Sequence, residues 1–336
     1  MATIKEIAGF AGVSTTTVSN VIHGKKSRVS PETFFAITSL LKKHHYVEKL
    51  GLRHLNNDKS QIICLIINPT RKYENTIFQD PFYGQILGMV EKLLHEKQYY
   101  LMVYVSIDIN DIFRTIAAWN ADGIIAVSFR AEDCDKLTLL TGKPVVSIDV
   151  MGTVTSRFIN IGLEDFEGGY RMTRYLITSG YDPIWIFANE DTGVDHERWR
   201  GYQKAFDEST LPYTRERYVF FPRNRDQRFR YYKTLLPQWK QCRGKGALFF
   251  LSDFYAIECI GFLSEHKLTV PRDIAVAGFD DTTYSRMSVP PLTTIHQDIP
   301  QKAVHAVDQL LRLLNHEPIL KQDIRLPVEL IIRGSA

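Results

Sequence analysis

The sequence predicts an α/β protein in which a three-helix unit at the N-terminus precedes two α/β subdomains with parallel sheets. Residues 4–44 carry apolar side chains at helical spacing, whereas from Gln61 onward short apolar runs alternate with helical stretches. With 336 residues the chain exceeds the usual size of a single core, so two or three domains are expected.

Residues 4–24 (IKEIAGFAGVSTTTVSNVIHG) predict two short helices joined by a turn. Thr3 can cap a first helix that Gly12 ends, and Ser14 can cap a second helix with one apolar face. The exposed start of the second helix presents short hydroxyl and amide side chains, which suit contacts to base edges and phosphates of DNA. These candidate DNA-binding residues are Thr15, Thr16, Thr17 and Asn20. The alternative is a capped surface helix of any small bundle.

A third helix is predicted to begin at Ser30-Pro31, where serine caps and proline takes the first helical position, and to continue to His44. We therefore expect a helix-turn-helix headpiece over residues 1–46. Residues 47–60 contain too few apolar side chains for a core and are expected to form a linker. A short helix there would form only when docked, because Gly51 costs about 1 kcal/mol relative to alanine.

The charge is unevenly distributed along the chain. Residues 1–59 hold nine Lys or Arg and four Asp or Glu, whereas the remainder holds 32 and 34. A basic headpiece on a slightly acidic body is expected where the headpiece meets DNA phosphates. Without the helix pattern, a solvated basic face would explain the same charges.

The rhythm after Gln61 predicts two sets of strands of comparable size, hence two subdomains with a cleft between them. Open α/β sheets bind ligands beyond the carboxyl ends of their strands, so both subdomains can offer loops to one small molecule. The expected strands are Ile62–Ile67, Tyr100–Val105, Gly123–Val127, Val145–Ile148, Ile184–Phe187, Ala247–Leu251 and Ile274–Gly278. The expected helices are Phe82–Lys97, Gly168–Ser179, Arg200–Glu208, Ala256–Glu265 and Lys302–Leu314.

Several function classes are disfavoured. The four cysteines are widely separated and form no Cys-x-x-Cys pair, which argues against disulfides and a metal site. No apolar run is long enough to span a membrane and the N-terminus lacks a signal peptide, so a cytoplasmic protein is expected. The chain has no P-loop, no Gly-x-Gly-x-x-Gly after a strand and no His-Glu-x-x-His, so neither an enzyme nor a cofactor is expected.

The first 24 residues, together with VPRDIAVAGFDDTTYSRMSVPPLTTIHQ at 270–297, resemble the LacI/GalR family of bacterial transcriptional repressors. FEGGYRMTRYLITSGY at 166–181 and HERWRGYQKAF at 196–206 agree with the same family. The resemblance implies a hinge helix within 47–60 and a two-lobed core similar to periplasmic sugar-binding proteins. It also implies dimers on palindromic operators and a small effector that alters DNA affinity. We place the N-terminal core subdomain at 61–161 with about 294–322, and the C-terminal one at 162–290 with about 323–336.

The resemblance assigns the DNA contacts. Thr15, Thr16 and Asn20 match the family's base readers, and Leu55 matches the hinge leucine that wedges into the minor groove. We add Thr17, the third hydroxyl at the start of the second helix, and Arg28, a cation of the headpiece. The expected DNA-binding residues are thus Thr15, Thr16, Thr17, Asn20, Arg28 and Leu55.

The resemblance also assigns the effector contacts. Arg198 matches the arginine of the family's R-x-x-G-[FY] motif, and Asp280 matches the first aspartate of its GFDD motif. A guanidinium and a carboxylate suit sugar hydroxyls, while an aromatic ring can cover an apolar sugar face. As alternatives, Asp280 caps a turn and Phe221 belongs to the core. The expected effector-binding residues are Tyr83, Asp149, Arg198, Phe221, Asp253 and Asp280.

Three departures from the family bear on these expectations. Leu163-Glu164 replace a usual Asp-Asn, which predicts a changed effector preference, and Phe34 replaces a common arginine. Gly51 in a hinge without the usual proline and alanines predicts a shallower operator preference.

We therefore predict a repressor of carbohydrate-utilisation genes that binds a palindromic operator as a homodimer and is released by a small sugar. The absence of C-terminal heptads favours a dimer over a tetramer. The alternatives are control by a purine or a protein corepressor, and a solute-binding protein.

Overall fold

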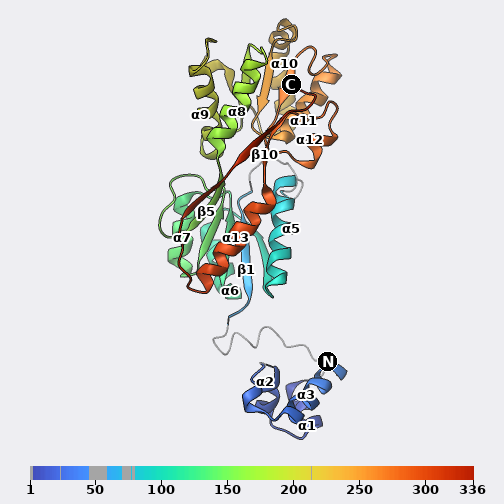
Figure 1. Ribbon diagram of the computed structural model, residues 1–336, viewed down its shortest axis with the longest axis vertical. Coiled ribbons are helices and arrows are strands. Elements are labelled where there is room, and N and C mark those ends of the chain that lie inside the picture. The colour runs from blue at the N-terminus through green and yellow to red at the C-terminus, as the bar shows by residue number, and fades with distance from the viewer. Residues whose placement is uncertain (1–2, 23, 45–58, 70–76, 78–79, 213) are drawn as a thin grey trace. The chain divides into compact units, whose positions relative to one another are not determined.

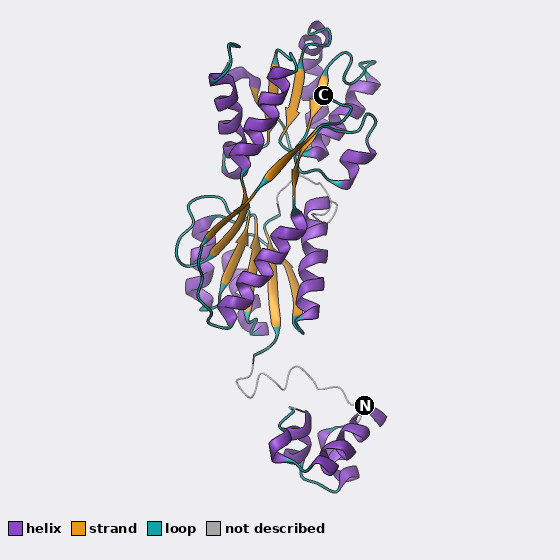
Figure 2. Ribbon diagram, in the orientation of Figure 1, coloured by secondary structure: helices purple, strands orange, loops and turns teal. Residues whose placement is uncertain are grey.

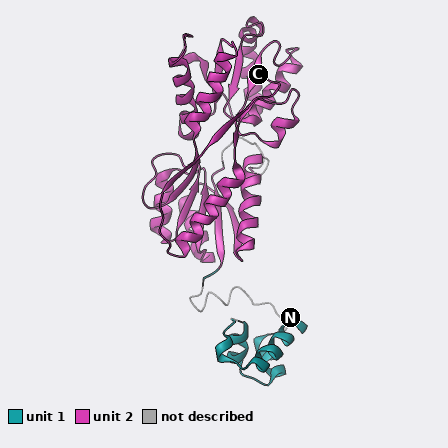
Figure 3. Ribbon diagram, in the orientation of Figure 1, with its two compact units in different colours: residues 1–60 teal, residues 61–336 magenta. Residues whose placement is uncertain are grey.

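The computed structural model describes residues 3–22, 24–44, 59–69, 77, 80–212 and 214–336. Residues 1–60 form one compact unit and residues 61–336 form another (Figure 3). The second unit begins at Gln61, where the hydrophobic rhythm changes. The expected hinge residues Gly51 and Leu55 lie outside the described residues. Within the described ranges, none of the helices has the length and apolar character needed to cross a bilayer.

The headpiece contains the three predicted helices, α1 (Ile4–Ala11), α2 (Thr15–Ile22) and α3 (Pro31–Lys43), with a 3-10 turn η1 (Lys26–Arg28) before α3. The side chain of Thr3 accepts a hydrogen bond from the Glu6 amide, and Gly12 ends α1 in the left-handed conformation, with φ of 65°. The three helices enclose a small core of Ile7, Ala8, Val18, Val21 and Ile37.

The first lobe is built on a six-stranded parallel sheet in the order β11-β5-β4-β3-β1-β2. Its central strand β1 (Ile62–Ile67) is buried on both faces, as continuous apolar strands of parallel sheets are. Helices α5 (Pro81–Glu96) and α13 (Ile299–Leu314) cover one face, and α6 (Ile109–Trp119) and α7 (Ala131–Thr141) cover the other (Figures 1 and 2). The other strands are β2 (Tyr100–Val105), β3 (Gly123–Val127), β4 (Val145–Ile148), β5 (Ile159–Leu163) and β11 (Asp323–Leu326).

The second lobe holds a four-stranded parallel sheet in the order β7-β6-β8-β9. Helices α8 (Asp165–Thr178) and α9 (Gly193–Asp207) pack on one face, and α10 (Arg225–Gln241) and α11 (Asp253–Glu265) pack on the other. The strands are β6 (Ile184–Ala188), β7 (Tyr218–Phe220), β8 (Ala247–Phe250) and β9 (Ala275–Ala277). A 3-10 turn η4 (Arg215–Arg217) and a short helix α12 (Thr283–Met287) lie in its connections.

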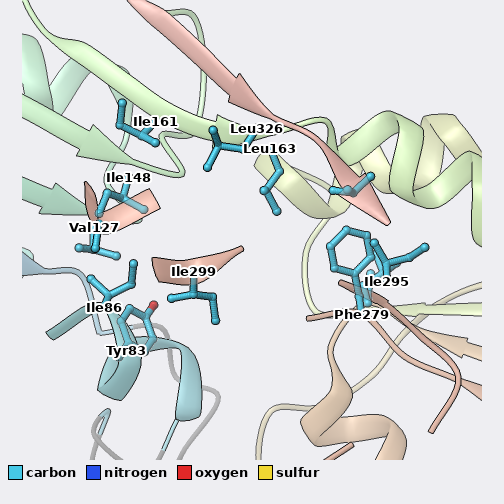
Figure 4. Close-up of a cluster of buried hydrophobic side chains, with 14 of the residues drawn as sticks. Tyr83, Ile86, Val127, Ile148, Ile161, Leu163, Phe279, Ile295, Ile299 and Leu326 are labelled. Atoms are coloured by element: carbon cyan, nitrogen blue, oxygen red, sulfur yellow. The ribbon is translucent and has the colours of Figure 1, made fainter. Parts of the chain in front are cut away.

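The chain crosses between the lobes three times. It passes from β5 into α8, from β10 (Thr294–Gln297) into α13, and from β11 into β12 (Val328–Ile331), which pairs antiparallel with β10. Because β11 pairs with β5, the first lobe includes Asp323–Leu326, four residues beyond the expected boundary at 322. Figure 4 shows the buried cluster passing through Leu163 and Leu326, where strands cross, to Phe279 and Ile295.

Helices α8 and α9 touch backbone to backbone at two glycines. A Cβ on Gly169 would overlap the carbonyl oxygen of Arg198, and a Cβ on Gly201 would overlap the carbonyl oxygen of Phe166. The Gly-Gly and R-x-x-G segments therefore have a structural reason: only glycine lets the two helices approach this closely. The contact fixes the place of Arg198 relative to the start of α8.

Candidate functional site

A cavity lies between the two lobes of the core, at the carboxyl ends of both sheets. Its walls come from the loops after β3, β4, β6 and β9 and from the first turns of α5 and α9. This is the position where open α/β sheets bind ligands. The residues that line it are Asp80, Phe82, Tyr83, Ser128, Asp149, Met151, Asn189, Glu190, Thr192, Val194, Asp195, Arg198, Arg223, Asp280 and Gln297.

A chain of hydrogen bonds runs along one wall from the first lobe to the second. Lys302, a fully buried side chain in the first turn of α13, donates to both carboxylate oxygens of Asp149 at 2.8 and 2.7 Å and to Oε1 of Gln297 at 2.8 Å. Gln297 donates in turn to Oδ1 of Asp280 at 2.7 Å, and Ser252 donates to Oδ2 of Asp280 at 3.1 Å. The two predicted carboxylates are thus held by donors at fixed positions, in opposite lobes.

Arg198 also lines the cavity and is held by three contacts. Its Nε donates to Asp165 at 2.8 Å, its Nη1 donates to the Leu251 carbonyl at 2.8 Å, and the guanidinium lies 3.5 Å from the centre of the Phe279 ring. Burial raises the pKa of Asp165 to about 6, although the positive charge of Arg198 opposes that rise.

Asn189 supplies an available donor to the cavity. It directly follows β6, and its Nδ2 is buried without a hydrogen-bond partner among the described residues. Its backbone amide donates to Asp195 at 3.2 Å, which holds the loop against the start of α9. A buried amide without a partner is costly, so a polar ligand atom that accepts from Asn189 would be stabilised at this point.

Two aromatic side chains complete the cavity at the start of α5. Asp80 caps that helix by accepting from the Phe82 amide at 2.9 Å, and this turn brings Phe82 and Tyr83 to the cavity. The rings stand edge to face, 5.2 Å apart. The Tyr83 hydroxyl lies 3.4 Å from the Ser128 hydroxyl. The cavity therefore combines apolar ring surface with hydrogen-bonding groups.

Four of the six expected effector residues line this cavity: Tyr83, Asp149, Arg198 and Asp280. Phe221 does not, because its ring is packed in the second lobe's core, 4.7 Å from the ring of Tyr255. This is the alternative that the sequence left open. Asp253 does not line the cavity either. It is fully buried and accepts from Thr294 at 2.5 Å and from the Thr282 amide at 2.8 Å, so it joins α11 to the GFDD loop.

Sequence reasoning missed the contributions of Asn189, Gln297 and Lys302. A signal existed for Asn189, because it follows an expected strand and strand ends in both subdomains were expected to face the cleft. Gln297 and Lys302 gave no such signal, because only the second crossing between the lobes brings Gln297 to the cavity and Lys302 against Asp149.

The headpiece presents the expected DNA-binding residues of α2 on its surface. Thr15 and Thr16 are exposed, Asn20 is half-buried, and Arg28 is exposed at the end of η1. Thr17 is engaged at the helix start, where its amide donates to the Ser14 hydroxyl at 3.1 Å and the two hydroxyls lie 2.9 Å apart. Its hydroxyl is therefore less available than those of Thr15 and Thr16.

Phe34, which stands where an arginine is common, packs against the headpiece core. Lys26 lies with its Nζ 5.8 Å from the centre of the Phe34 ring. The aromatic ring thus adds apolar contact in α3.

Comparison with known proteins gives two family matches. Residues 3–48 match the model described as bacterial regulatory proteins, lacI family, and residues 173–336 match a periplasmic binding protein-like domain. The HTH-type transcriptional repressor PurR of Haemophilus influenzae is 30% identical over 345 residues, which cover 100% of this chain and 98% of that protein.

Solved structures share the fold. The lac repressor dimer bound to operator and the anti-inducer ONPF is 21% identical with a TM-score of 0.81, over 99% of this chain and 98% of that one. The complex of the transcriptional regulator CelR with cellobiose is 24% identical with a TM-score of 0.72, over 100% of both chains.

Proposed function

Since the chain belongs to the LacI family of DNA-binding transcriptional repressors, we propose that a small sugar bound between the lobes of its core releases it from its operator. The family is one of regulators and not of enzymes, and its members act on DNA in the cytoplasm. The sugar, the direction of its effect and the contact residues are the proposed part.

The observation that supports a sugar as the effector is the chemistry of the residues that line the cavity. Asp149 and Asp280 can accept from ligand hydroxyls, while Asn189 and Arg198 can donate to them, and Phe82 and Tyr83 offer ring surface. Within the protein, Lys302 balances the charge of Asp149, Asp165 that of Arg198 and Glu190 that of Arg223. The other carboxylates of the lining accept hydrogen bonds from neutral groups; they are Asp80, Asp195 and Asp280. A neutral polyhydroxyl ligand fits such a site without bringing a charge of its own. The CelR structure with cellobiose supports the same class.

The release follows from linkage. A ligand that contacts both lobes stabilises the arrangement in which both sets of contacts form, and it lowers DNA affinity by its preference for that arrangement. We further propose that two copies pair through their cores and place two headpieces on a palindromic operator, with Thr15, Thr16 and Asn20 at base edges. The exposed apolar side chains of Tyr284, Met287 and Val289 support pairing through the core.

A purine is the second candidate effector, and one finding favours it. Relatives that match the full length of the chain at about 30% identity include repressors named PurR. A planar base would use the same cavity by stacking on Phe82 or Tyr83 and bonding to Asn189 and the carboxylates.

The test is fluorescence anisotropy on DNA from upstream of the chain's own gene, with and without mono- and disaccharides and purine bases. Site-selective binding that one sugar weakens is the expected result. Asn189→Ala should lose the response to that sugar and keep DNA affinity. Thr16→Ala should bind the operator more weakly, and the sugar should still release the DNA that remains bound. Release by a purine alone would replace the sugar with the second candidate, and binding indifferent to every compound would contradict both.

A further inference from the structure

The second lobe carries a concentration of positive charge that the effector cavity does not explain. Residues 214–245 contain ten Lys or Arg and two Asp or Glu, whereas the rest of residues 61–336 contains 22 and 32. The segment includes η4, β7, all of α10 and the connection from α10 to β8. This segment is basic, whereas the rest of the core is acidic. It is therefore a candidate binding surface for a polyanion.

Half of these cations are used inside the fold. Arg215 pairs with Asp191, Arg217 with Asp182 and Arg223 with Glu190, while Arg225 and the buried Arg228 both pair with Glu258. The other five are exposed and form no ion pair with any described residue. These five, Arg230, Lys233, Lys240, Arg243 and Lys245, are called the α10 ridge below.

Three of them lie on the exposed side of α10. Tyr232 and Trp239 face the core of the second lobe. Lys233 and Lys240 each follow one of them and are seven residues apart, so they lie above one another on one flank of α10, while Arg230 points away from the core. Ten residues separate Arg230 from Lys240, a distance of about 15 Å along the axis. The last two members of the ridge follow the end of the helix.

The neighbours of these cations indicate what kind of polyanion fits. The other exposed side chains between Arg230 and Arg243 are Thr234, Pro237, Gln238 and Gln241, and the exposed Asp226 and Gln227 precede Arg230. None of the large exposed apolar side chains found in the described residues lies on α10. Protein interfaces concentrate aromatic and apolar anchors at their centre, which the ridge lacks. Lys, Arg, Gln and Thr are the side chains that contact phosphate oxygens of DNA.

We propose that the α10 ridge binds the phosphate backbone of duplex DNA, without regard to base sequence, as a DNA contact additional to the headpiece. A helix row of this length spans two to three phosphates of one strand, so the contact is weak by itself.

The test uses the full chain and a duplex of about 30 base pairs of random sequence, with anisotropy measured from about 50 to 200 mM salt. The ridge variant is Arg230→Gln, Lys233→Gln, Lys240→Gln and Arg243→Gln. Its matched control removes the same number of exposed charges elsewhere in the core, by Lys92→Gln, Lys97→Gln, Lys136→Gln and Lys321→Gln. The ridge variant should bind about tenfold more weakly at low salt, and its salt slope should be shallower by about 2 than that of the control.

Equal slopes and affinities in the two variants would overturn the proposal and would leave an acidic protein surface as the partner of the ridge. Lys240→Glu provides an independent check, because one reversed charge at an exposed position keeps the fold. It should weaken binding to random DNA more than Lys136→Glu does, and an equal effect would also overturn the proposal. Release by sugar should be unchanged in every variant, so this result is separate from the effector proposal.

Discussion

The headpiece and the core place their candidate functional side chains by different means. In the headpiece, Thr15, Thr16 and Asn20 come from one helix of eight residues, and a local pattern of caps and apolar spacing determines their exposure. In the core, Asp149, Arg198 and Asp280 are far apart in the chain and meet only because two sheets and three crossings bring their loops together. The candidate DNA-binding side chains are therefore positioned within one short segment, whereas the cavity depends on packing throughout the core.

The largest expected change in unfolding free energy comes from substituting a helical glycine of the core, and a helical glycine of the headpiece serves as its counterpart. Gly169→Ala should cost more than about 4 kcal/mol of unfolding free energy, because the new Cβ would overlap the Arg198 carbonyl and force α8 and α9 apart. Gly9→Ala in α1 meets nothing within 4 Å and should stabilise by about 0.5–1 kcal/mol. Denaturant unfolding measures both. Similar effects of the two substitutions would break the comparison.

The next effect concerns the buried ion pair of the cavity. Lys302→Met should destabilise the protein by about 3–5 kcal/mol, because the carboxylate of Asp149 loses its partner within the fold. Adding Asp149→Asn should recover most of that loss, and Lys26→Met on the exposed headpiece turn should change little. The three variants are compared by thermal unfolding. A double variant as unstable as Lys302→Met would show that packing of the lysine, and not its charge, is what matters.

The raised pKa of Asp165 should make the unfolding free energy of the core depend on pH. Its folded pKa of about 6 lies above the usual value of 3.8, so its contribution is fully present below about pH 4 and is lost as the pH rises through 6. Asp165→Asn removes this titration. Relative to that variant, the wild type should lose on the order of 2–3 kcal/mol between pH 4 and pH 7. Unfolding curves for the pair that stay parallel over this range would contradict the assignment.

The smallest effect tests the local character of the headpiece. Ser30 caps α3 by accepting from the Thr33 amide at 3.3 Å, so Ser30→Ala should cost about 1 kcal/mol. Amide exchange in α3 should then be about fivefold faster, while exchange in the core stays the same. Ser39→Ala, on an exposed turn of the same helix, should not accelerate exchange. Acceleration in the core would show that the units are not independent in this respect.

The same difference explains what the sequence could predict. The caps at Thr3, Ser14 and Ser30 are local, so all three headpiece helices were predictable. Some strands are buried on both faces and were predictable because they are continuous apolar runs, for example Ile62–Ile67 and Gly123–Val127. In contrast, α9 begins at Gly193, seven residues before the expected Arg200, because its first turns face the cavity and carry polar side chains.

Helix α10 escaped prediction for a related reason. It is rich in Arg and Gln and contains Pro237, so its apolar stripe is weak in the sequence. Among the site residues, Arg198 and Asp280 were accessible through motifs, whereas Lys302 looks like an ordinary charge at a helix start. The lysine is buried against Asp149 because of the path that the chain takes at the second crossing between the lobes, which the sequence does not indicate.

The backbone contact at Gly169 and Gly201 has a mechanical consequence. Two helices that touch without intervening side chains have no compliant layer between them, so α8 and α9 form one stiff lever. Arg198 sits on this lever and is bonded to Asp165, directly after the first crossing at Leu163. A ligand bound to Arg198, as proposed above, would therefore shift α8 and α9 together with the strand that joins the two lobes.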